Sequence, residues 1–176
     1  MLSALAVSGY IIQPPPLPMD AGSPMARAGD FEKRAPSLWE AQARAHATLK
    51  EQRDRFDELF ERAHELSATP TELRDLAREV RARELQAAEI LRPRIEGLRS
   101  RLSSPKANVD TPMMRSWRRL AEESLEIGIA WLELYQNLQI RLYKLASDLL
   151  AVDHPPSPVF SDAEAATDYL RKLIAE

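Results

Sequence analysis

Cysteine is absent from this 176-residue chain, and glycine is scarce, with 5 residues. The lack of cysteine excludes disulfides, cysteine nucleophiles and thiolate metal sites. Aromatic residues make up 6% of the chain, and the net charge is only -3, so neither sign of charge dominates. What remains is 29% charged and 44% hydrophobic and is rich in alanine, leucine, glutamate and arginine. This composition is typical of long helices, and the length suits one domain.

Proline sets the ends of the chain apart from its middle. Residues 1–36 hold six prolines, four of them between Pro14 and Pro18, which predicts a disordered proline-rich leader. The apolar opening lacks the basic region of a secretory signal and is too short to cross a bilayer. Two alternatives are a start at Met25 and a PxxP ligand at Pro15 to Pro18. A second proline-rich linker is predicted over 153–160, followed by an amphipathic helix over 161–176.

Helix starts are marked by capping residues. A hydroxyl residue precedes a glutamate by three positions at Ser37, Thr69 and Ser161, the spacing of a capping box. Pro70 and Pro112 fit the first helical position, where no amide hydrogen is needed. These signals predict helices over about 38–66, 70–103, 112–152 and 162–175.

Apolar residues recur at alternating spacings of three and four within these segments, which indicates heptad seams typical of coiled coils. The predicted fold is all-α: an elongated antiparallel up-down-up bundle of three long helices over 37–152, plus the short C-terminal helix. Gln42 and Gln52 interrupt the first seam. The third helix has an unusually broad apolar face from Leu125 to Leu150, which favours a homodimer if the other helices leave it uncovered.

No complete catalytic or metal site can be assembled from the chain. Glu61 and His64 have the spacing of one half of a di-iron site, but no second half exists. Glu126 and Glu133 share a helix side without a histidine or nucleophile beside them. We therefore expect no enzyme, no cofactor and no metal. An enzyme would require Glu61, His64, Glu126 and Trp131 to converge in a pocket.

Large aromatic residues on the third helix are candidates for partner binding. Ala121, Ser124 and Gly128 form a run of small residues flanked by Trp117 and Trp131, which favours a tight helix crossing over a ligand groove. The C-terminal helix favours docking on its own bundle over docking in a partner's groove. The predicted partner-binding residues are Trp117, Trp131, Tyr135, Tyr169, Leu170 and Leu173.

Basic residues gather around the connection between the second and third helices. Residues 92–119 contain eight basic and two acidic residues, a local charge of +6. We call this stretch the basic tip; it is either ordinary solvated surface or a site for phosphates of nucleic acid or lipid. The net charge of the chain and the lack of aromatic residues from 92 to 116 disfavour nucleic acid and leave an anionic membrane surface possible. The candidate anion-binding residues are Arg99, Arg101, Lys106, Arg115, Arg118 and Arg119.

Taken together, the sequence predicts a non-enzymatic, cytoplasmic helical bundle that binds another protein through its helix faces, as an adaptor, assembly factor or regulatory subunit. The sequence does not identify that partner, and no transmembrane segment is expected. The alternative is an anion-binding protein that uses the basic tip.

Overall fold

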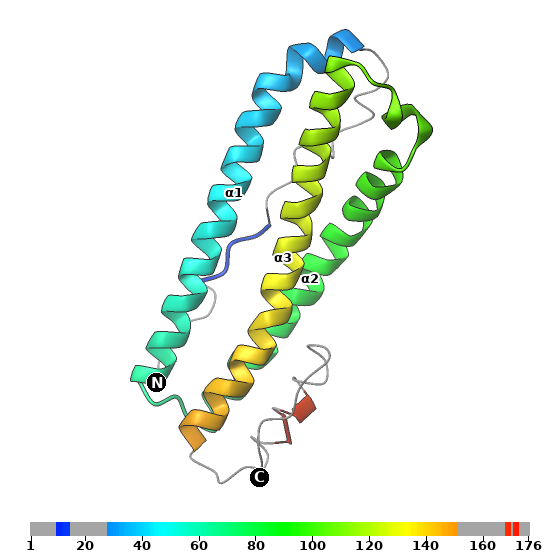
Figure 1. Cartoon of the computed structure of the whole chain (residues 1–176). Coiled ribbons are helices and arrows are strands. Elements are labelled where there is room, and N and C mark those ends of the chain that lie inside the picture. Colours follow the sequence, from blue (N-terminus) through cyan, green and yellow to red (C-terminus); the bar gives the residue numbers. More distant parts are fainter. Residues whose placement is uncertain (1–9, 15–27, 151–167, 170, 173–176) are drawn as a thin grey trace. The chain divides into compact units, whose positions relative to one another are not determined.

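The computed structural model describes residues 10–14, 28–150, 168–169 and 171–172, and it is all-helical, with no strand in these ranges. The elements are α1 (Ala28–Glu65), α2 (Pro70–Leu102), the 3-10 helix η3 (Pro105–Asn108) and α3 (Pro112–Leu150) (Figure 1). The helical fold class and the packing of three helices are confirmed. The expected C-terminal helix lies mostly outside the described residues.

The predicted capping box at Thr69 starts α2, and a threonine before the predicted first-turn proline Pro112 caps α3. At α2 the backbone N–H of Glu72 donates to Oγ1 of Thr69 at 3.3 Å, and the N–H of Thr69 donates to Oε2 of Glu72 at 2.9 Å. At α3 the N–H of Met114 donates to Oγ1 of Thr111 at 3.2 Å. Each side chain satisfies a backbone group that the first helical turn leaves without an internal partner.

The start of α1 differs from the prediction. Residues 28–36, which the sequence assigned to a disordered leader, are helical, and Pro36 lies inside the helix. The expected capping box at Ser37 is therefore wrong: the Ser37 hydroxyl instead donates to the carbonyl of Arg34 at 2.8 Å. Pro36 removes one backbone hydrogen bond. Burial of Phe31, five residues earlier, offsets this loss by anchoring the first turns.

The end of α1 is a Schellman motif without glycine. The N–H of Ala68 donates to the carbonyl of Ala63 at 3.1 Å, and the N–H of Ser67 donates to the carbonyl of His64 at 3.0 Å. Ser67 has a φ of 50°, in the left-handed region that this motif requires and that glycine favours. Ala63 and Ala68 are both buried, which adds the apolar contact usual in this motif.

The chain divides into two compact units, each made of stretches of all three helices. Unit 1 comprises residues 1–12, 52–86 and 133–176, and unit 2 comprises residues 13–51 and 87–132. The core of unit 1 includes Phe56, Leu59, Leu73, Leu76, Val80, Tyr135, Leu138 and Leu142. The core of unit 2 includes Phe31, Leu38, Leu49, Leu91, Leu98, Trp117, Leu120, Ile127 and Trp131. Among the described residues, most apolar positions of the predicted seams are buried, which fits the packing of three helices; coiled-coil geometry stays a prediction.

Candidate functional site

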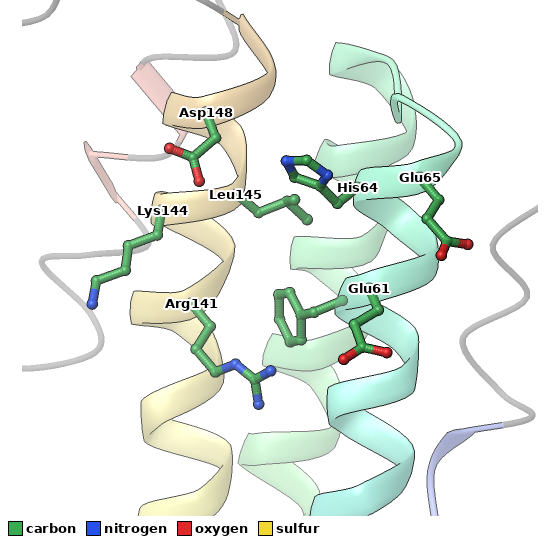
Figure 2. Close-up of a pocket in the computed structure, with 8 residues that line it drawn as sticks. Glu61, His64, Glu65, Arg141, Lys144, Leu145 and Asp148 are labelled. Carbon is green, nitrogen blue, oxygen red and sulfur yellow. The ribbon is translucent and has the colours of Figure 1, made fainter.

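A cleft of about 440 Å³ opens in unit 1 between the last turns of α1 and α3 (Figure 2). We call it the unit 1 cleft. Its lining residues are Phe60, Glu61, His64 and Glu65 from α1 and Arg141, Lys144, Leu145 and Asp148 from α3. Phe60 and Leu145 are buried and form an apolar floor, and the remaining side chains are polar.

Two contacts with α1 position the side chain of Arg141 in this cleft. Its guanidinium carbon lies 4.3 Å from the centroid of the Phe60 ring, within the range of a cation–π contact. Its Nη1 atom lies 2.7 Å from Oδ1 of Asp57 on α1. Arg141 thus reaches from α3 to α1 and presents a positioned cation beside the apolar floor.

The charges around the unit 1 cleft are of both signs. Three carboxylates line it, from Glu61, Glu65 and Asp148, against the cations of Arg141 and Lys144. A surface of this kind does not select a simple anion or cation by net charge. It suits a partner that carries apolar groups and charges of both signs, as protein surfaces do.

His64 and Glu61 both lie at this cleft, at the spacing that the sequence marked as half of a metal site. Within the described ranges, no group of three or more histidine, cysteine, aspartate or glutamate side chains is arranged to hold a metal ion. Glu61 and His64 are both part of the polar lining of the cleft.

The predicted partner-binding residues of α3 lie in the interior. Trp117, Trp131 and Tyr135 are at most 1% exposed, so they form the chain's own core and leave no surface for a partner to contact. The interpretation of these three as a partner surface is corrected accordingly. Their size at seam positions places them inside, where large apolar side chains contribute most to stability.

The C-terminal candidates are described only in part. The ring of Tyr169 packs edge-on against that of Tyr143 on α3, with centroids 5.1 Å apart. Leu170 and Leu173 lie outside the described residues. Docking of the C-terminal helix on its own bundle stays a prediction, which this one ring contact fits.

The six candidate anion-binding residues all belong to unit 2, in the last turn of α2, in η3 and in the first turns of α3. Arg115 Nη1 lies 2.6 Å from Oδ1 of Asp110, and Arg119 Nε lies 3.1 Å from Oε1 of Glu123. Arg119 also lies over the ring of Trp39, 5.3 Å from its centroid. These contacts occupy Arg115 and Arg119. Arg101 and Arg118 are half-buried, and Arg99 and Lys106 are exposed.

One polar cluster was missed by the sequence, which treated Gln52 as an interruption of the seam. Gln52 is fully buried, and its side-chain amide binds the backbone of residues 10 and 12. The hydroxyl of Tyr135 donates to the carbonyl of Ile12 at 3.3 Å. Burial raises the pKa of Tyr135 to about 12, although the positive charge of Arg83 lowers it in part. Tyr135 is therefore a hydrogen-bond donor at neutral pH.

No helix among the described residues is both long and apolar enough to cross a membrane. No protein-family model, curated protein or solved structure matches this chain.

Proposed function

We propose that this protein is a non-enzymatic protein–protein interaction module that binds its partner at the unit 1 cleft. The observation that carries the proposal is the arrangement of Arg141, which lies over the buried ring of Phe60 and is tied to Asp57. A positioned arginine beside an aromatic floor is the kind of feature that contributes most to affinity in protein interfaces.

The rim of the cleft supports a protein partner over a small ion. Its three carboxylates, two cations and one histidine offer several charge-assisted hydrogen bonds in different directions. Such a rim surrounds an apolar centre that excludes water on binding. We expect the partner to present an apolar side chain to Phe60 and Leu145 and a carboxylate to Lys144.

The test is affinity capture with chemical cross-linking and mass spectrometry, comparing wild-type protein with Lys144→Glu and Glu61→Lys. Both variants reverse a charge at the rim of the cleft, and we expect each to lose the same captured protein. Arg62→Glu is the matched control, because Arg62 is exposed on α1 outside the cleft lining. The proposal is wrong if the captured proteins are the same for all four chains.

Three further expectations accompany this proposal. The up-down-up order is supported by the short connection between α1 and α2, Leu66 to Thr69, which favours antiparallel neighbours.

A homodimer is supported by Leu125, Leu132 and Leu134 on α3, which are only half-buried. Light scattering after size exclusion tests the dimer. The cytoplasmic location expected from the sequence stays a prediction, which cell fractionation tests.

A second candidate function is anion binding at the basic tip, supported by one observation. Arg99 and Lys106 are exposed, and neither makes an ion pair with any residue that the structure describes. Cations without a carboxylate partner remain available for phosphate groups. Salt-dependent binding tests this candidate.

A further inference from the structure

Gln52 of α1 holds a short segment of the N-terminal part of the chain by its backbone. Its Oε1 atom accepts a hydrogen bond from the N–H of Ile12, and its Nε2 atom donates to the carbonyl of Tyr10 at 2.7 Å. These two backbone groups flank Ile11 and belong to residues two positions apart. A residue in a parallel β-sheet binds its neighbouring strand through the same pair of groups. The side-chain amide of Gln52 thus makes the same pair of hydrogen bonds that one residue of a neighbouring strand would make.

Tyr135 of α3 supplies a third contact to the same segment. Its hydroxyl donates to the carbonyl of Ile12 at 3.3 Å, a longer and weaker bond than that of Gln52. The Tyr135 ring packs against Phe56 in a T-shaped arrangement, with centroids 5.9 Å apart and an interplanar angle of 75°. Two side chains from two helices therefore bind three backbone groups of residues 10–12, all within unit 1 (Figure 1, blue trace).

With residues 10–12 in place, Gln52 is fully buried, at 0% exposed, and both ends of its amide are hydrogen-bonded to this segment. Loss of the segment would leave a buried donor and a buried acceptor unpaired, at a cost in stability for each. An apolar residue at this seam position would avoid that cost, so the amide is explained by what it binds.

The hydrogen bonds at this site do not depend on the identity of the bound side chains. All three contacts are to backbone atoms, and the side chains of Tyr10, Ile11 and Ile12 are only half-buried. A different extended peptide with free backbone N–H and C=O groups and apolar side chains would make the same contacts. Backbone hydrogen bonds supply affinity in this mode of recognition, as in strand addition to a sheet edge.

We propose that Gln52 and Tyr135 form a binding site for an extended apolar peptide segment of a protein partner, and that residues 10–12 occupy this site as a displaceable internal ligand. Fifteen residues separate Ile12 from the start of α1 at Ala28. A tether of this length gives the internal ligand a high effective concentration. Weakly binding peptides therefore do not displace residues 10–12, whereas a partner segment that binds more tightly does. This site is separate from the unit 1 cleft and does not depend on it.

The first test measures whether Gln52 holds the segment in the full chain. Amide hydrogen exchange followed by NMR should show protection of the Ile12 N–H in wild-type protein and at least a tenfold loss of protection in Gln52→Leu. Gln42→Leu is the matched control, because Gln42 is also buried on α1 but lies in unit 2. Equal exchange of Ile12 in wild-type protein and Gln52→Leu would overturn the proposal.

The second test opens the site without shortening the chain. Ile12→Pro removes the N–H that donates to Gln52, so the internal ligand should bind more weakly. A fluorescent peptide with the sequence of residues 8–16 should then bind Ile12→Pro at least tenfold more tightly than it binds wild-type protein. Adding Gln52→Leu to Ile12→Pro should reduce that binding tenfold or more.

Circular dichroism separates these outcomes from a loss of folding, because all variants should keep the helical spectrum and a cooperative melt. The proposal is overturned if the peptide binds wild-type protein and Ile12→Pro equally, or if it binds neither. It is also overturned if Gln52→Leu leaves binding to Ile12→Pro unchanged.

Discussion

The Ser124 hydroxyl on α3 donates a 3.0 Å hydrogen bond to Oε1 of Gln42 on α1. Both residues lie in unit 2, and they are 0% and 2% exposed. Ser124 thus lies where α3 contacts α1 in unit 2, and the tight helix crossing expected at Ala121, Ser124 and Gly128 stays a prediction. Nε2 of Gln42 has no hydrogen-bond partner among the described residues. Gln42 therefore depends on Ser124 for its only hydrogen bond from the described part of the chain.

This pair predicts a non-additive pattern of stability. Ser124→Ala should lower the free energy of unfolding by about 1–3 kcal/mol, because it leaves the whole buried amide of Gln42 without a partner. Gln42→Leu should cost less, because it removes both polar atoms, and the remaining hydroxyl can bind a carbonyl of its own helix. The double variant should be more stable than the sum of the single losses predicts. Urea unfolding of the four chains checks this, and additive losses would contradict the coupling.

The sequence predicted those features that depend on local chemistry or on simple periodicity. The cap at Thr69 needs only one hydroxyl and one glutamate at the right spacing, and both hydrogen bonds form. The seams needed only the order of apolar residues, and most of those residues are buried. Leu66 is an exception at 47% exposed, because α1 ends at Glu65 and the chain turns there.

The remaining features depend on contacts between residues distant in sequence. Gln42 and Gln52 break the seam pattern, and their partners lie 82 and about 40 positions away. No spacing rule connects a buried glutamine to such partners. The start of α1 was missed for a similar reason: proline disfavours a helix locally, whereas the burial of Phe31 that supports it is a tertiary effect.

Replacing Ser67 with glycine should stabilise the folded protein. It adopts a φ of 50°, which is strained for a residue with a Cβ atom, and its side chain is exposed. Ser67→Gly should raise the free energy of unfolding by about 0.5–1 kcal/mol, since glycine adopts this conformation without strain. Thermal melting followed by circular dichroism measures the change. Ser67→Ala is the control, because it retains the Cβ atom and should not stabilise; equal stabilisation by both would contradict the argument.

Phe31 tests whether the first turns of α1 belong to the folded core. It is 3% exposed in unit 2, whereas the neighbouring Glu32 is exposed. Phe31→Ala should lower the free energy of unfolding by about 3 kcal/mol, as for other large buried aromatic side chains. Glu32→Ala should change it by less than about 0.5 kcal/mol. If both variants unfold at the same urea concentration as wild-type protein, residues 28–36 do not contribute to the core.

The raised pKa of Tyr135 predicts a loss of stability in alkali. Its folded-state pKa is about 12 because burial disfavours the phenolate, against an ordinary value of 10.0 for tyrosine. Between these two values the folded chain binds more protons than the unfolded chain, so stability falls as pH rises from about 10 to 12. Below pH 10 this contribution is fully present. Tyr135→Phe should flatten the fall over this range, measured by urea unfolding at pH 9 and 11. An unchanged slope would contradict the assignment to Tyr135.

The basic tip separates the two candidate functions, because phosphate binding depends steeply on salt whereas binding at a mixed-charge cleft does not. If Arg99 and Lys106 contact phosphates, affinity for a single-stranded DNA oligonucleotide or for vesicles with anionic lipid should fall sharply as salt rises from about 50 to 200 mM. The reason is that binding releases counterions from the phosphates, and added salt opposes that release. Arg99→Glu with Lys106→Glu should abolish binding without unfolding the chain, because exposed charges contribute little to stability. Arg53→Glu with Arg62→Glu makes the same change in net charge at exposed positions of α1 and should retain most of the binding. Fluorescence anisotropy and vesicle sedimentation measure the two ligands separately. Anion binding is wrong for this protein if wild-type chain binds neither ligand at low salt, or if both double variants lose affinity equally, and the unit 1 cleft then stands as the one proposed function.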